Sequence, residues 1–177
     1  MNTKIEDFSL RKIVPQFREF NSAVRDNRDR LSPYFWWASA SKYAKFKFIL
    51  VALLIEKIAK HLCDLPHNKK FIIRDNGKFV GIVGLDGLSQ CAPRTEIWIF
   101  VTREYTGNHI ASRALKLAEE YARKQHVDKI YARTRQTNIP AKQLFVSNGY
   151  DVSYGGEAFG HNEIFWYKFL QDKVIEK

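Results

Sequence analysis

The segment that most constrains the fold lies between residues 69 and 124, where three strand-like stretches are followed by a helix. The first two, "KKFIIR" and "KFVGIVGL", flank Asp75-Asn76-Gly77, and Asn-Gly between apolar runs is typical of a tight β-hairpin. "RTEIWIFVT" predicts a third strand, with positions 96, 98 and 100 on one face and positions 97, 99 and 101 on the other. Three consecutive strands are therefore expected.

The helix after the third strand has its apolar residues on one stripe with a 3.6-residue period: Ile110, Ala111, Ala114, Leu117, Ala118, Tyr121 and Ala122. "KIYARTRQ" then predicts a further strand. A helix that crosses over between two strands of one sheet leaves them parallel, whereas hairpin strands are antiparallel. The chain is thus expected to form a mixed sheet of the α/β class.

The remaining segments extend this pattern at both ends. "DFSLRKIV" (7–14) predicts a first strand, a helix begins near Pro15, and a long helix covers 41–65. A short helix from Pro140 and two last strands at "YDVSY" and "EIFWYKFL" complete the order. No linker divides the chain, so we expect one domain over 1–177.

Composition indicates the cellular compartment and the kind of partner that this chain would have. The two cysteines, Cys63 and Cys91, are too few for a disulfide scaffold and lack metal-site spacing, and the N-terminal stretch has no apolar run, so we expect a cytoplasmic protein. The apolar run Phe48–Ile55 is far shorter than the ~20 residues of a membrane span, which favours a buried helix and no membrane contact. A net charge of +10 favours an anionic partner such as a phosphorylated cofactor or an acidic protein. Nucleic acid is disfavoured because the basic residues are scattered.

The turn Thr106–His109 between the third strand and its helix indicates a binding function. A helix N-terminus presents unpaired backbone N–H groups and partial positive charge, and a glycine lets a phosphate approach them. Arg103 and Arg113 add cationic groups nearby. The alternative is an ordinary loop whose glycine serves only its geometry. The turn matches neither the P-loop nor the dinucleotide fingerprint.

Three motifs resemble one known family. They are "GKFVGIVGLDGL" (77–88), "RTEIWIFVTREYTG" (94–107) and "TNIPAKQLFVSNGYDV" (137–152), in the order and spacing of the GNAT superfamily of acetyl-CoA-dependent N-acetyltransferases, of the RimJ/RimL-like type that acetylates ribosomal proteins. The resemblance covers about residues 71–152. It implies a mixed central sheet of about six or seven strands flanked by about four helices.

The resemblance also implies a site for acetyl-CoA, with no metal. The residues that it assigns to the cofactor are Ile99, Phe100, Val101, Thr106, Gly107, Asn108, His109, Ile110, Ala111, Asn138 and Lys142. Thr106 stands where the family has Gln or Arg, and His109 stands where it has the central glycine. Asn138 is alternatively a helix N-cap, and Lys142 is alternatively a solvated surface lysine.

Glu96 is the candidate general base, because it is a carboxylate within an apolar strand, where its pKa would rise toward the operating pH. Its alternative role is a strand-end ion pair with Arg94 or another cation. Phe145 stands where many members of the family have a tyrosine. That leaves three options: another proton donor, such as Tyr150, Ser147 or Tyr154; thiolate release without an acid; or impaired catalysis.

The leading functional hypothesis is acetyl transfer to a primary amine, such as a protein N-terminus, by a monomer or homodimer. One alternative is a small amine as acceptor, such as a polyamine or an antibiotic. Another is a catalytically impaired regulatory module that binds coenzyme A. The aromatic segment 35–37 is expected to pack in the core or to form a wall of the acceptor pocket.

Overall fold

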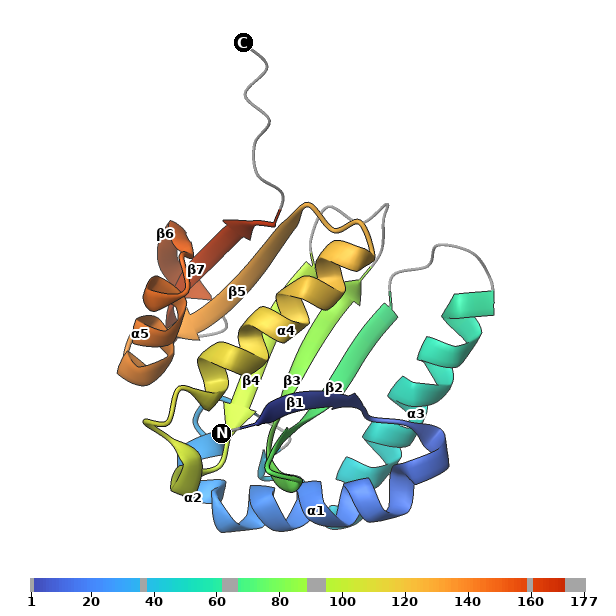
Figure 1. The fold of residues 1–177 in the computed structure, drawn as a ribbon. Coiled ribbons are helices and arrows are strands. Elements are labelled where there is room, and N and C mark those ends of the chain that lie inside the picture. The colour runs from blue at the N-terminus through green and yellow to red at the C-terminus, as the bar shows by residue number, and fades with distance from the viewer. Residues whose placement is uncertain (1, 36–37, 62–66, 89–94, 159–160, 171–177) are drawn as a thin grey trace.

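A computed structural model describes residues 2–35, 38–61, 67–88, 95–158 and 161–170. Seven strands form one mixed sheet in the order β1-β2-β3-β4-β5-β7-β6 (Figure 1). The strands are β1 (Thr3–Asp7), β2 (His67–Asp75), β3 (Lys78–Leu88), β4 (Thr95–Val101), β5 (Lys129–Arg135), β6 (Asp151–Ala158) and β7 (His161–Phe169). The helices are α1 (Ile13–Asp26), α2 (Arg28–Leu31), α3 (Lys42–His61), α4 (Ile110–Lys124) and α5 (Ile139–Ser147), with 3-10 helices η1 (Leu10–Lys12) and η3 (Arg103–Tyr105).

The predicted hairpin and crossover are both present. Asn76 and Gly77 join β2 to β3 with φ values of 49° and 80°, a backbone that Asn and Gly adopt at low cost. β4 runs antiparallel to β3, and α4 carries the chain over to β5, which runs parallel to β4. The mixed α/β sheet expected from the sequence is confirmed.

β4 and β5 stay together for only a short distance. Their register is Thr95 with Ile130 and Glu96 with Tyr131, and the pairing ends there. On its other edge, β4 remains paired with β3 as far as Val101. The segment Ile97–Val101 therefore has one backbone edge in the sheet and one edge facing the gap that opens toward β5.

Two apolar cores cover the two faces of the sheet. α4 and α5 pack on one face, where Ile97 of β4 joins the core that contains Ile110 and Phe145. α1 and α3 pack on the other, where Phe100 of β4 joins Phe20 and Ile49 (Figure 1). The alternation predicted for β4 is confirmed, because its odd-numbered and even-numbered apolar residues belong to different cores.

The prediction of a first strand over residues 7–14 is wrong, because the strand lies earlier in the chain. β1 ends at Asp7, and the chain then turns through η1 into α1. The amide of Gln16 holds this turn, because its Nε2 donates to Asp7 O at 2.9 Å and its Oε1 accepts from Ser9 N at 2.9 Å. A side chain from the next helix thus ends the strand, which alternation alone does not reveal.

The helices otherwise follow the sequence. Five α-helices are described where about four were expected, the addition being the four-residue α2. The long helix predicted for 41–65 is α3, described as far as His61. Cys63, Cys91 and Arg94 lie outside the described residues. None of the helices in the described ranges combines the length and the apolar character that crossing a membrane requires.

Gly84 on β3 lies opposite Trp98 on β4. A β-carbon added at Gly84 would lie 2.3 Å from the Trp98 indole, so a side chain at position 84 would overlap this ring. We predict that Gly84→Ala lowers the free energy of unfolding by about 1–3 kcal/mol through overpacking, measured by denaturant unfolding. The control is Gly156→Ala on β6, where the added atom meets nothing within 4 Å. Equal stability of the two variants would contradict the packing role of Gly84.

Candidate functional site

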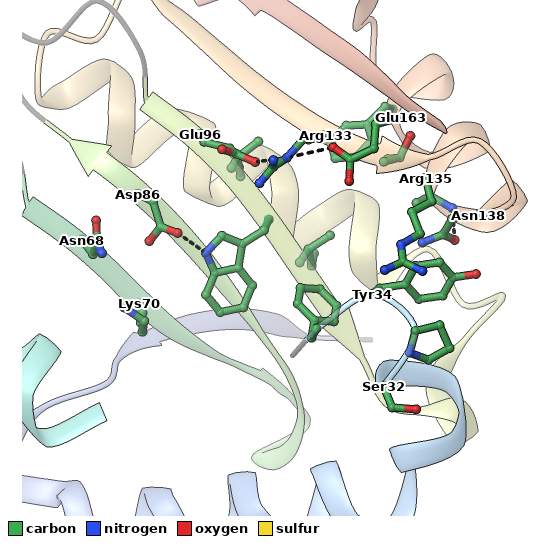
Figure 2. Close-up of a pocket in the computed structure, with 18 of the residues that line it drawn as sticks. Ser32, Tyr34, Asn68, Lys70, Asp86, Glu96, Arg133, Arg135, Asn138 and Glu163 are labelled. Atoms are coloured by element: carbon green, nitrogen blue, oxygen red, sulfur yellow. Dashed lines mark hydrogen bonds and ion pairs between the residues drawn. The ribbon is translucent and has the colours of Figure 1, made fainter. Parts of the chain in front are cut away.

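Two cavities meet beside β4. The first, here named the α4 groove, has a volume of about 670 Å³ and lies between the end of β4, the start of α4, and α5. The second, the β4 pocket, has a volume of about 580 Å³ and lies over β3, β4, β5 and β7 (Figure 2). Both are lined by Pro33, Tyr34, Phe35, Ile99, Asn138 and Ala141. The two cavities are therefore adjacent and share one set of lining residues.

The turn at the head of α4 has the backbone geometry of an open helix start. Gly107 has φ 80°, and His109, the N-cap, is left-handed with φ 56°. His109 is exposed, and its side chain makes no capping hydrogen bond to the described helix. The first backbone N–H groups of α4 thus have no cap from this residue, and such groups bind anions.

Most of the residues predicted for the cofactor line the α4 groove: Ile99, Phe100, Val101, Thr106, Gly107, His109, Ile110, Ala111 and Asn138. Asn108 and Lys142 line neither cavity in the described chain. The carbonyl of Asn108 accepts from Arg113 Nη2 at 3.0 Å, and Lys142 Nζ donates to Gln136 O at 3.5 Å. Contact of Asn108 and Lys142 with a cofactor stays a prediction.

Asn138 has the helix-capping role that its sequence position allowed, and its contact with a cofactor stays a prediction. It is the N-cap of α5, and its Oδ1 accepts from Ala141 N at 3.3 Å. It also lines both cavities, at the point where they join. The cap thus fixes a polar side chain at the junction of the α4 groove and the β4 pocket.

Glu96 lies in the β4 pocket beside an arginine from the neighbouring strand. Arg133 Nε is 3.5 Å from Glu96 Oε1 and 3.4 Å from Glu163 Oε2, so one guanidinium bridges two carboxylates (Figure 2). Burial raises the pKa of Glu96, the nearby carboxylates of Asp86 and Glu163 also raise it, and Arg133 opposes them. The side chain is still 43% exposed, so a ligand can reach it. Such a carboxylate is a stronger base than a fully solvated one and is suited to accept a proton.

Asp86 forms a second acidic wall of the β4 pocket. It pairs with Glu96 across the β3–β4 ladder. Its Oδ2 accepts from Trp98 Nε1 at 3.0 Å, and Oδ1 is buried with no hydrogen-bond partner in the described part of the structure. Burial raises the pKa of Asp86, whereas the charge of Lys70 and the hydrogen bond from Trp98 lower it.

The segment after α2 forms the wall common to both cavities. Tyr34 and Phe35 line each of them, and Phe35 packs against Trp98 with ring centroids 6.0 Å apart. Phe35 thus packs in the core and also forms a pocket wall, and residues 36–37 lie outside the described chain. Asn27 anchors this region, because its Oδ1 accepts from Arg103 N at 2.8 Å and its Nδ2 donates to Ala23 O at 2.9 Å.

The candidate proton donors differ in their surroundings. Phe145 is buried, lines the β4 pocket and packs on Tyr150 with centroids 4.9 Å apart. Burial and the neighbouring Glu119 raise the pKa of Tyr150, which makes its phenol a weak acid. Tyr154 is exposed and stacks on Phe165, while Ser147 lines the α4 groove.

Five charged residues that line the β4 pocket were missed by sequence reasoning: Lys70, Asp86, Arg133, Arg135 and Glu163. Asp86 carries the same signal as Glu96, a carboxylate inside an apolar strand, and could have been singled out. Arg133 and Glu163 lie on strands whose pairing becomes visible only in the folded sheet. No cluster of His, Cys, Asp and Glu suited to a metal ion is found among the described residues.

Comparison with known proteins identifies the family. The model of the acetyltransferase (GNAT) family matches residues 21–150. This is well over half of the chain, so the chain belongs to the GNAT acetyltransferase family. The family expected from the three sequence motifs is confirmed.

Individual relatives agree with this. Spermidine N(1)-acetyltransferase of Escherichia coli (strain K12) is 29% identical over 94 residues, a match that covers 52% of this chain and 50% of the relative. The chain thus matches about half the length of its curated relatives.

Two solved structures share the fold. One is a Salmonella typhimurium acetyl transferase that modifies the N-terminal serine of ribosomal protein L7/L12 (TM-score 0.79, 12% identity, 96% of this chain and 95% of that one). The other is a Vibrio cholerae spermidine N-acetyltransferase with coenzyme A and spermine (TM-score 0.68, 20% identity, 95% of each chain). At these identities the likeness establishes the fold, and the expected GNAT architecture is confirmed.

The bridge made by Arg133 predicts how Glu96 titrates. Because the guanidinium favours the ionised carboxylate, Arg133→Gln should raise the pKa of Glu96 further. Carboxyl-carbon NMR titration measures this directly. Arg135→Gln is the control, since Arg135 lines the same pocket but its guanidinium lies over the Tyr34 ring, 5.8 Å from the centroid. An Arg135 variant that shifts the Glu96 titration as much as the Arg133 variant would contradict the assignment.

Proposed function

We propose that the protein transfers the acetyl group of acetyl-CoA directly to a primary amine, with Glu96 as general base. The observation that carries this proposal is the position of the Glu96 carboxylate. It lies in a pocket that joins, at Ile99 and Asn138, a groove ending at an uncapped helix N-terminus. A phosphorylated thioester donor and an amine acceptor would meet at this junction.

The α4 groove supports the donor half of the proposal. The diphosphate of acetyl-CoA would bind the first N–H groups of α4, where the helix dipole and the open turn at Gly107 favour an anion. The pantetheine arm would lie along Ile97–Val101, which follows the last register pair of β4 with β5. Backbone binding of this kind tolerates the unusual Thr106 and His109, since neither side chain has to supply the contact.

The reaction needs few groups from the protein. The lone pair of the amine attacks the thioester carbonyl, a backbone N–H of β4 stabilises the oxyanion, and Glu96 takes the proton that the amine loses. The C–S bond then breaks and coenzyme A leaves as a thiolate. Because thiols have pKa values near about 8.5, the thiolate can depart without a dedicated acid. This supports an active enzyme despite Phe145 in place of tyrosine.

A protein N-terminus is the acceptor that the pocket fits best. The charged residues that line the β4 pocket are Asp86, Glu96 and Glu163 against Lys70, Arg133 and Arg135, and their formal charges cancel. A polycation would require an acidic excess, whereas a peptide α-amine carries one charge. The L7/L12 N-terminal acetyltransferase shares the fold, which supports this choice. The second candidate is a polyamine, favoured by the sequence match to spermidine acetyltransferases.

Replacing Glu96 distinguishes the hypothesis of an active enzyme from that of a regulatory module. Glu96→Gln should lower kcat by about 100- to 10,000-fold, because the amine loses its proton acceptor. Acetyl-CoA affinity should stay near the wild-type value, since the donor lies in the other cavity. Steady-state kinetics and calorimetry provide the two readouts. An unchanged kcat would remove Glu96 from the mechanism, and coenzyme A binding by an inactive wild type would favour the regulatory module.

Filling the α4 groove tests the donor site. Ala111→Trp places an indole at the first turn of α4 and should weaken acetyl-CoA binding by about tenfold or more, because steric overlap costs about 1–3 kcal/mol. Val146→Trp on α5 is the matched control, since Val146 is exposed and lies outside both linings. Titration calorimetry with acetyl-CoA compares the two. Equal affinities would mean that the diphosphate binds elsewhere.

A further inference from the structure

The β4 pocket contains a carboxylate for which the mechanism above gives no use. Asp86 lies in its wall with one oxygen fixed by the indole N–H of Trp98 and the other buried without a hydrogen-bond partner in the described structure. A buried carboxylate oxygen that lacks a partner is destabilising. The fold nevertheless retains it, which points to a partner that arrives with a ligand.

The surroundings hold Asp86 in one orientation. Gly84, two residues earlier on β3, has no side chain, and the Trp98 indole occupies the space where a β-carbon would be. This position lets Trp98 Nε1 donate to Asp86 Oδ2 at 3.0 Å. The carboxylate is therefore preorganised and does not have to be ordered when a ligand binds.

Asp86 is also the cross-strand neighbour of Glu96. Directly opposed residues of an antiparallel pair have β-carbons about 4.5–5.5 Å apart, so one small cation can contact both carboxylates. Two adjacent carboxylates repel each other, and a cation between them relieves that repulsion. A primary ammonium group has three N–H donors, enough to serve Asp86 and Glu96 together.

We propose that Asp86 binds the amino group of the acceptor as an ammonium ion beside Glu96 and so restricts the acceptor to cationic primary amines. The inference rests on the proposed acetyl transfer and specifies how its acceptor is recognised. One ammonium proton passes through the partly exposed Glu96 to solvent, a second N–H stays hydrogen-bonded to Asp86, and the freed lone pair attacks the thioester carbon. Glu96 then takes the second proton that the nitrogen loses as the C–S bond breaks and the thiolate departs. Asp86 gains no proton in this step; it holds the nitrogen in place.

The test is Asp86→Asn, assayed at saturating acetyl-CoA with two acceptors: spermidine and a synthetic hexapeptide with a free N-terminal serine. For the acceptor that the wild type uses, kcat/KM should fall about 10- to 100-fold, the range expected for losing a charge-assisted hydrogen bond, with most of the change in KM. Asp86→Glu, which restores the charge, should recover part of this loss. Asp151→Asn, an exposed carboxylate on β6, is the control and should behave as wild type.

Denaturant unfolding distinguishes a ligand-binding role of Asp86 from a structural role. If Asp86 serves the ligand, Asp86→Asn keeps an oxygen for Trp98, removes a poorly satisfied charge and unfolds at the same or a higher denaturant concentration than wild type. An unchanged KM, or a loss of stability in which kcat and KM change together, would overturn the role of Asp86 and leave the acetyl transfer intact. A wild type that acetylates neither acceptor would overturn the proposed function and this inference with it.

Discussion

The separation of β4 from β5 after Glu96 is the constraint on which the rest of the site depends. β4 is paired with β3 from Glu96 to Val101, whereas its register with β5 ends at Glu96. Backbone N–H and C=O groups at such an edge require another hydrogen-bonding partner. The α4 groove opens along this edge and the β4 pocket lies beside it, and both cavities are lined by Ile99. One break in one ladder thus creates both halves of the site.

The parts of the fold that could be predicted are those set by neighbouring residues. Asn76 and Gly77 determine the hairpin because both adopt positive φ, and the apolar stripe of α4 determines which face is buried. β1 was misplaced because its end depends on Gln16, a residue of the following helix. A contact from a side chain several residues away does not alter the alternation of apolar and polar residues in the strand, so that alternation cannot predict where the strand ends.

The same distinction holds for the site. The turn Thr106–His109 and the strand Ile99–Val101 could be predicted because each is a continuous segment with its own motif. The charge bridge through Arg133 could not, since it joins residues of β4, β5 and β7 whose register is set by the whole sheet. Asp86 falls between these cases: its position in an apolar strand was visible, but its pairing with Glu96 required the β3–β4 register.

The anchor at Asn27 has a consequence for how the two substrates influence each other. It ties the end of α1 to the backbone just after β4, and the chain that leaves α2 a few residues later forms a wall of both cavities through Tyr34 and Phe35. A molecule that settles in either cavity restricts the same stretch of chain. Binding of the second molecule then costs less conformational entropy, because this stretch of chain is already ordered by the first. With the two cavities assigned to donor and acceptor as proposed, we expect each substrate to favour the binding of the other without any change of fold.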